Sequence, residues 1–137
     1  MTVVIDTNVV AYLLLGTERF AGESSRFMSA VQQSLAPALW EAELANVVWM
    51  AIQQGVMPPE EGPSRLALAA RLGIRSIPSR SLWQGALVRA VSSGVAVYDT
   101  LFVELAVRER LRLATFDRKV LKAFPDVAAR PGDLTPC

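Results

Sequence analysis

A short hydrophobic run near the start of the chain ends abruptly in polar residues. Residues 3–5 are Val, Val and Ile without polar alternation, and Asp6, Thr7 and Asn8 follow directly. Such a run is typical of a strand that is covered on both faces within a parallel sheet. Because ligands bind at the carboxyl ends of the strands in an open α/β sheet, Asp6 lies where a functional site is expected.

Helical and strand patterns alternate along the rest of the chain. Apolar spacing and helix-start or helix-stop residues predict helices at residues 9–15, 19–33, 39–55, 58–73, 79–94, 99–110 and 117–124. Short apolar runs predict further strands at residues 35–36, 74–77, 111–115 and 127–129. The alternation predicts a doubly wound α/β fold, and 137 residues with 52% hydrophobic content suffice for a single domain over residues 1–137.

Two helices carry local signals that can be tested. Ser79 or Ser81 is expected to cap the helix at residues 79–94. Glu104 and Arg108 are spaced to form an i,i+4 ion pair, which we expect on the outer side of the helix at residues 99–110.

Hydrophobic residues are more abundant in two segments than one small core requires. These segments are residues 9–15 and 47–52, and they predict a homodimer and a groove for a partner helix. Most aromatic side chains are expected in the core or an interface, and no platform for stacking nucleic-acid bases is evident. The residues concerned are Tyr12, Phe20, Phe27, Trp40, Trp49 and Trp83.

Composition narrows the available chemistry. The formal net charge is +1, so any nucleic acid must be bound by a local patch. The chain has no histidine, and its only cysteine is Cys137, which excludes histidine general bases, an internal disulfide and thiolate zinc sites. Carboxylate oxygens remain as metal ligands, and they favour Mg²⁺ or Mn²⁺.

Nothing in the sequence predicts export or membrane insertion. The amino terminus lacks a basic segment followed by an apolar one. The longest stretch without Asp, Glu, Lys or Arg, residues 44–59, is too short and too polar to span a bilayer. We therefore expect a cytoplasmic protein.

Three aspartates share one local setting, because Asp6, Asp99 and Asp117 each lie just before or at the start of a predicted helix. Helix capping explains each of them taken singly. Glu43 could equally belong to a solvated stripe with Asn46. Taken together, carboxylates gathered at strand ends repel one another and have raised pKa values unless a cation neutralises them, and a hard divalent ion is the natural cation.

The chain resembles a known family in four acidic segments. These are VIDTN at residues 4–8, PALWEAELAN at 37–46, YDTLFVELA at 98–106 and LATFD at 113–117. They are similar to the four motifs of PIN-domain nucleases, and more narrowly to VapC toxins of toxin-antitoxin pairs. The resemblance implies one PIN-like domain with a central parallel sheet of five strands, ordered 3-2-1-4-5 and flanked by helices.

The resemblance also assigns roles to residues of this sequence. It implies that Asp6 and Asp99 are the principal metal ligands and that Glu43 and Asp117 complete the catalytic cluster. It selects Glu43 over Glu41, which spacing alone leaves open. The residues implied to orient these acids by hydrogen bonds are Asn8, Thr115 and, less directly, Thr7.

Two segments depart from the family pattern. Residues 108–112 are basic and lack the glycine that family members often place before the fourth strand, so this turn is expected to be built differently. Residues 56–78 match nothing specific, and they predict nothing about substrate or partner.

The implied activity is hydrolysis of RNA phosphodiester bonds with one or two Mg²⁺ or Mn²⁺ ions, leaving 5′-phosphate and 3′-hydroxyl ends. Arg118 and Lys119, next to Asp117, are candidate RNA contacts, whereas Arg108 and Arg110 are expected to be solvated. The implied partner is a VapB-type antitoxin.

Other functions compete with this one. A catalytically silent PIN-like module that binds RNA or protein could share the fold. However, a site that has lost its catalytic activity has no reason to retain mutually repelling acids. A phosphatase with Asp6 as nucleophile needs a second Asp where this chain has Asn8. A receiver-type phospho-acceptor needs an acidic pair beside the first strand.

Overall fold

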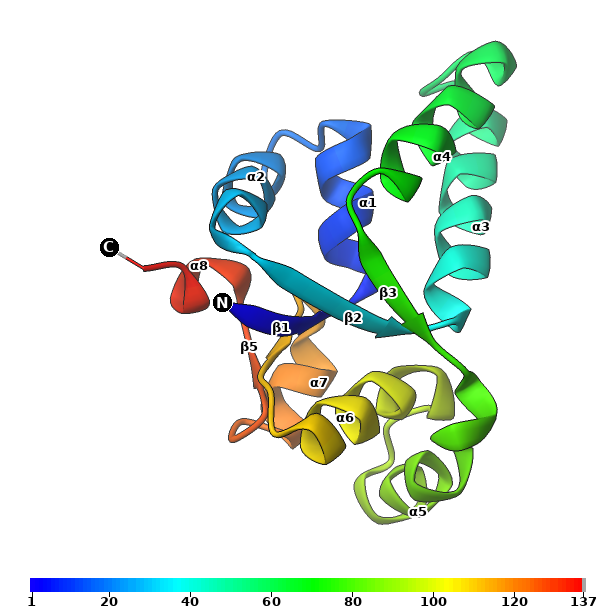
Figure 1. Cartoon of the computed structure of the whole chain (residues 1–137). Coiled ribbons are helices and arrows are strands. Elements are labelled where there is room, and N and C mark those ends of the chain that lie inside the picture. Colours follow the sequence, from blue (N-terminus) through cyan, green and yellow to red (C-terminus); the bar gives the residue numbers. More distant parts are fainter. Residues whose placement is uncertain (137) are drawn as a thin grey trace.

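The computed structural model describes residues 1–136, and Cys137 lies outside the described residues. Five parallel strands form one sheet in the order β3-β2-β1-β4-β5 (Figure 1). The strands are β1 (Thr2–Ile5), β2 (Gln33–Pro37), β3 (Ile74–Ile77), β4 (Leu113–Ala114) and β5 (Ala128–Ala129). The predicted fold class and strand order are thereby confirmed.

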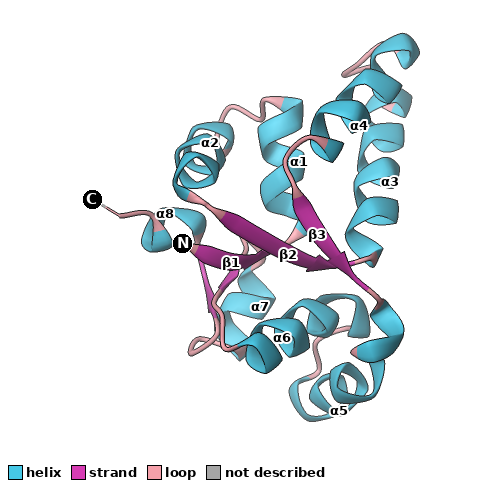
Figure 2. Ribbon diagram, viewed as in Figure 1, coloured by secondary structure: helices cyan, strands magenta, loops and turns pink. Residues whose placement is uncertain are grey.

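Helices cover both faces of the sheet. Helices α1 to α4 lie on one side, and α5, α6 and α7 lie on the other (Figure 2). The helices are α1 (Thr7–Leu15), α2 (Ala21–Ala30), α3 (Leu39–Gln53), α4 (Gly62–Ala70), α5 (Trp83–Ser93), α6 (Val97–Glu109), α7 (Arg118–Ala123) and α8 (Pro131–Leu134). Two 3₁₀ turns precede α4 and α5, namely η1 (Pro59–Glu61) and η2 (Ser79–Ser81).

The centre of the fold is β1 together with α6. Val3, Val4 and Ile5 are at most 1% exposed, as expected of a strand between two neighbours and two helical layers. Most of α6 is also buried, with Phe102 and Val103 at most 1% exposed. This rigid centre carries the amino-terminal ends of α1 and α6 at one edge of the sheet.

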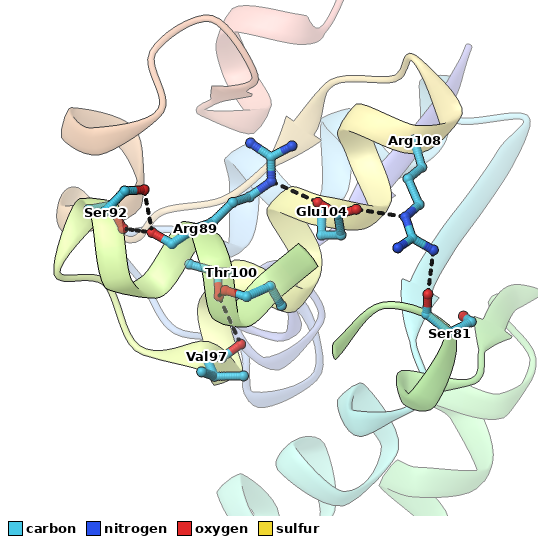
Figure 3. A network of polar contacts seen from close by, with 9 residues as sticks. Ser81, Arg89, Ser92, Val97, Thr100, Glu104 and Arg108 are labelled. Atoms are coloured by element: carbon cyan, nitrogen blue, oxygen red, sulfur yellow. Dashed lines mark hydrogen bonds and ion pairs between the residues drawn. The ribbon is translucent and has the colours of Figure 1, made fainter. Parts of the chain in front are cut away.

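A buried ion pair attaches α5 to α6, and its position corrects a prediction. Glu104 is only 8% exposed, so it faces inward rather than outward. Its carboxylate accepts hydrogen bonds from Arg89 of α5 (2.8 Å) and from Arg108 (2.6 Å), and Arg108 also donates to the Ser81 carbonyl (Figure 3). The carboxylate fits because residue 85 is glycine: a Cβ there would lie 2.4 Å from Glu104 Cδ. Arg108 is therefore not a free solvated charge.

One further local expectation is wrong. Neither Ser79 nor Ser81 caps α5, because both lie in the preceding 3₁₀ turn, and the Ser81 hydroxyl donates to the Pro78 carbonyl. The turn before β4 needs no glycine, since Arg110 itself adopts the left-handed conformation (φ 57°, ψ 42°) that a glycine commonly takes there.

The distribution of exposed apolar residues differs from the expectation for residues 9–15. Val9, Val10 and Leu14 are buried in the core, so this segment supplies little surplus surface. Most of the exposed large apolar side chains lie instead on α3 and α5. Those that are more than half exposed on these two helices are Trp49, Trp83, Leu87, Val88 and Val91.

The length and composition of the helices bear on whether the chain can cross a bilayer. Among residues 1–136, no single helix is long and apolar enough to cross a membrane. Within this part of the chain, the one pair of helices with the required length and composition is α5 with α6, and the two are bent by 115° where they meet.

Candidate active site

The carboxyl end of β1 places Asp6 at the edge of the sheet. The Asp6 amide donates to the Ala114 carbonyl (3.0 Å), which extends the pairing of β1 with β4. Asp6 occupies the residue before α1, but its side chain makes no capping hydrogen bond. It is also only 7% exposed. Helix capping therefore does not explain this aspartate.

Hydrogen bonds from distant residues orient the Asp6 carboxylate. Thr115 Oγ1 donates to Asp6 Oδ2 at 2.7 Å, and Asn8 Nδ2 lies 3.4 Å from the same oxygen. Thr115 Oγ1 in turn accepts from the Asp117 amide (3.0 Å), and Asn8 Oδ1 accepts from the Phe116 amide (3.2 Å). Asn8 and Thr115 thus link the end of β1 to the loop after β4.

Helix α3 carries Glu41 and Glu43, two acids between which sequence spacing alone could not choose. Glu43 Oε1 accepts a hydrogen bond from Thr7 Oγ1 at 2.8 Å, next to Asp6. Glu41 instead accepts from Ser76 Oγ (3.2 Å) on β3. The structure therefore brings Glu43, and not Glu41, to the end of β1.

Asp99 and Asp117 reach the same place from two other elements. Asp99 is the third residue of α6. The N-cap of this helix is Ala96, so Asp99 does not occupy the capping position. Asp117 does cap its helix: its Oδ1 accepts from the amides of Lys119 (2.8 Å) and Val120 (3.2 Å). The capping interpretation is thus correct for Asp117 alone, and a capping carboxylate can keep its second oxygen for other contacts.

All four acids line one cleft of about 370 Å³. Asp6, Glu43, Asp99 and Asp117 come from four segments that are far apart in the sequence. The remaining lining residues are Thr7, Asn8, Ala11, Tyr12 and Val47. Of these, sequence reasoning missed Ala11, Tyr12 and Val47, which lie on α1 and α3 within largely apolar runs that predict only core packing.

Comparison with known proteins agrees with this arrangement. The family model for the PIN domain matches residues 3–128. The chain belongs to the PIN-domain family. It is also similar to "Ribonuclease VapC3" of Pyrobaculum aerophilum, with 28% identity over 129 residues that cover 91% of this chain and 96% of that protein. The resemblance drawn from the four acidic segments is therefore confirmed.

In this PIN domain, burial and, to a smaller extent, neighbouring acids raise the pKa values of Asp6, Glu43 and Asp99. Burial, with additions from the Asp99 and Glu43 charges, raises the pKa of Asp6 from 3.8 to about 7, although the Thr115 hydrogen bond opposes it. Burial likewise raises the pKa of Glu43, and the Asp99 charge adds to this. Burial and the Asp117 charge raise the pKa of Asp99, whereas Lys119 lowers it. The cleft is therefore a place where a cation is favourable.

The donor set suits a hydrated divalent ion rather than a closed protein cage. Within residues 1–136, no three acidic or cysteine side chains are grouped tightly enough to hold a metal ion by themselves. Magnesium is commonly held by one or two carboxylates with water completing its shell, which the PIN-domain acids can provide. Asp6 is the most buried of the four carboxylates, whereas Glu43 and Asp99 are half-buried to a similar extent.

Basic residues lie at one rim of the cleft. Lys119 is exposed, and its charge is near enough to Asp99 to lower the pKa of that acid. Arg118 is also exposed at the start of α7. Arg118 and Lys119 are the two basic residues that directly follow Asp117 in the sequence. Both side chains are accessible to an incoming anion.

Proposed function

We propose that this protein is a Mg²⁺- or Mn²⁺-dependent endoribonuclease that hydrolyses RNA phosphodiester bonds as the toxin of a VapBC-type toxin-antitoxin pair. The observation that carries the proposal is that four acids from separate segments line one cleft in a PIN domain. The catalytic and metal-binding residues are Asp6, Glu43, Asp99 and Asp117. A cytoplasmic location follows from the RNA substrate.

The raised pKa values support a cation as part of the working site. Asp6 with a pKa of about 7 is partly protonated at neutral pH, and Glu43 and Asp99 are shifted in the same direction. A divalent ion stabilises the ionised carboxylates, because its positive charge offsets the repulsion between them. When bound, that ion supplies a positive charge for the phosphate and lowers the pKa of an attacking water.

The residues around the acids hold them in place for this chemistry. Thr115 and Asn8 keep one Asp6 oxygen fixed, and Thr7 does the same for Glu43. The remaining carboxylate oxygens face the cleft and can accept protons or bind the cation. Since no histidine is present, proton transfer falls to these carboxylates and water. The products carry 5′-phosphate and 3′-hydroxyl ends.

Arg118 and Lys119 contact the RNA phosphates at the rim. Both are exposed, and Lys119 lies close enough to Asp99 for their charges to interact. A cation at this position offsets the repulsion between the acidic cleft and the polyanion. Removing either charge weakens RNA binding and flattens its dependence on salt.

A groove beside the cleft accepts the antitoxin. It has a volume of about 480 Å³ and lies between α1 and α3, with apolar residues on both sides. Val47 lines both this groove and the acidic cleft, so the two are adjacent. An amphipathic helix of a VapB-type protein seated in the groove can therefore extend its tail over the acids.

The outer face of α5 forms a homodimer interface. The only charged residue of α5, Arg89, is turned inward to Glu104. A two-fold interface packs the same face of both subunits together, so a face without charge avoids repulsion between like charges. The exposed residues of this face are Trp83, Leu87, Val88 and Val91.

The decisive experiment compares cleavage by the wild type and by Asp6→Asn on structured and unstructured RNAs. We expect cleavage in Mn²⁺ or Mg²⁺, none in EDTA, and none with Asp6→Asn in either condition. Asp126→Asn is the matched control, because Asp126 is exposed and does not line the cleft. Mapping the new ends tests for 5′-phosphate and 3′-hydroxyl groups.

Other results would point elsewhere. Cleavage that continues unchanged in EDTA contradicts the proposal. Equal cleavage by the wild type and by Asp6→Asn indicates a contaminating nuclease. Tight RNA binding with no cleavage by either protein favours the silent binding module.

A further inference from the structure

Three aromatic rings from distant segments meet beside the acidic cleft. They are Tyr12 on α1, Phe20 just before α2, and Phe116 in the loop between β4 and α7. The ring centroids are 4.7 Å apart for Tyr12 and Phe20, 4.7 Å for Phe20 and Phe116, and 5.3 Å for Tyr12 and Phe116. We call this group the aromatic wall.

The aromatic wall adjoins the cleft of the acids through Tyr12. Tyr12 lines the cleft together with Asp6 and Asp117. Phe116 lies between Thr115 and Asp117 in the chain, and its amide donates to Asn8 Oδ1 at 3.2 Å. A molecule that reaches the acids along this side of the cleft therefore passes the aromatic wall.

These rings differ from the aromatic residues of the core. Phe27 and Phe102 are at most 1% exposed, whereas all three rings of the wall are partly exposed. Tyr12 and Phe20 also lie outside the main hydrophobic core, and only Phe116 packs against it. Filling the core therefore does not account for the wall, and part of its surface is open to a ligand.

Cations accompany the rings. The Arg19 guanidinium lies 5.1 Å from the Phe20 centroid, and within residues 1–136 Arg19 belongs to no ion pair. Arg130 lies 5.3 Å from the Phe116 centroid, but its charge is compensated by Glu23 at 2.6 Å. A partly exposed ring beside an uncompensated guanidinium suits a planar base whose neighbouring phosphate needs a cation.

From these observations we infer that the aromatic wall is a subsite that stacks one base of the RNA next to the cleaved phosphate, with Arg19 contacting an adjacent phosphate. The inference rests on the proposed ribonuclease function and adds a preference for an unpaired nucleotide at one fixed position. Stacking requires an unpaired base, so cleavage within a stable duplex is disfavoured.

Fluorescence anisotropy of a labelled single-stranded RNA, measured at low salt in EDTA, tests the inference without cleavage. The RNA is compared with versions that lack one base at each position in turn. For the wild type, loss of the base at one position should weaken binding about tenfold, within the range of roughly 5- to 150-fold expected for one stacked base.

Substitutions in the aromatic wall test whether an aromatic ring itself is responsible for binding the base. Tyr12→Leu should weaken binding of the intact RNA by a similar factor and should no longer respond to the missing base. Tyr12→Phe keeps the ring and should behave like the wild type, and Phe20→Leu provides a second loss of a wall ring. Trp49→Leu is the matched control, because Trp49 is exposed on α3 and lines neither the cleft nor the groove.

Each result has one meaning. Base-dependent binding that is lost in Tyr12→Leu, with an unchanged melting temperature, supports the inference even if no RNA is cut, in which case only the ribonuclease proposal fails. Cleavage by the wild type with binding that is indifferent to the missing base and to both ring variants overturns the inference alone. Loss of binding with a lowered melting temperature in both ring variants assigns the wall a structural role and also overturns it. No RNA binding by the wild type overturns both proposals.

Discussion

The Thr115 hydroxyl donates a 2.7 Å hydrogen bond to Asp6 Oδ2, although the two residues are 109 positions apart in the chain. Thr115 lies just after β4, and Asp6 lies just after β1, so the parallel pairing of these two strands creates the contact. The bond favours the charged form of a carboxylate that burial would otherwise keep protonated. This relationship leads to the first prediction.

Thr115→Val should weaken divalent-ion binding by about 10- to 100-fold, because the orienting hydrogen bond to Asp6 is lost. The rise in melting temperature on titration with Mn²⁺ measures this affinity, since an ion that binds only the folded protein stabilises it. Thr115→Ser keeps the hydroxyl and should retain the wild-type affinity. An undiminished response to Mn²⁺ in Thr115→Val would show that Thr115 does not support ion binding.

Asp6→Asn should make the metal-free protein more stable at neutral and alkaline pH. Burial raises the pKa of Asp6 to about 7, so the folded protein retains a proton that the unfolded chain releases above pH 3.8. The free energy of unfolding of the wild type therefore falls as the pH rises from 3.8 to about 7, and then levels off. At pH 8 the variant should be more stable by up to about 4 kcal/mol.

Urea unfolding in EDTA at pH 5 and pH 8 measures this difference. The advantage of Asp6→Asn should be larger at pH 8 than at pH 5. An advantage that stays constant, or that grows toward acid pH, contradicts a raised pKa of Asp6. Asp126→Asn serves as the control for removal of an exposed carboxylate.

Gly85→Ala should destabilise the protein by about 2 kcal/mol, because the new methyl group overlaps the Glu104 carboxylate and forces α5 or the side chain to shift. In the Glu104→Ala background the same substitution should cost much less, since the obstructing group is gone. A double-mutant cycle from urea unfolding measures this coupling. Equal costs in the two backgrounds would show that the fit between Gly85 and Glu104 is not what restricts residue 85.

Glu104→Ala alone should also destabilise the protein, because Arg89 and Arg108 lose their buried carboxylate. Burial acts to raise the pKa of Glu104, but hydrogen bonds from the two arginines outweigh it, and the net shift is downward. The stabilisation is thus fully present above pH 4.5 and is lost as the pH falls below that value. The deficit of Glu104→Ala should accordingly shrink in acid.

Leu87→Asp or Val91→Asp should convert the proposed homodimer to a monomer, because each buries two unpaired charges, one from each subunit, in an apolar two-fold interface. Light scattering coupled to size exclusion measures the molar mass. Leu68→Asp on α4 is the control, since Leu68 is also exposed but lies on the other side of the sheet. A dimer that survives both α5 substitutions at the same concentration would place the interface elsewhere.

Much of the fold and of the acidic site could be predicted from the sequence. The β-branched run at residues 3–5 indicated a buried central strand, and it placed Asp6 at the sheet edge because parallel strands share that edge. The four acidic segments predicted the family that comparison confirmed. Such local patterns suffice because strand burial and helix ends depend on neighbouring residues.

Other features were decided only when distant segments packed together. Glu104 looked like an outward-facing residue, yet the space left by Gly85 on another helix turned it inward. Likewise, no pattern linked Tyr12 and Phe116, which meet only because β1 and β4 are neighbours in the sheet. Periodicity records which face of one element is apolar. It does not show which side chains of a neighbouring element fill the space against that face, or where such an element leaves space, because both depend on three-dimensional packing.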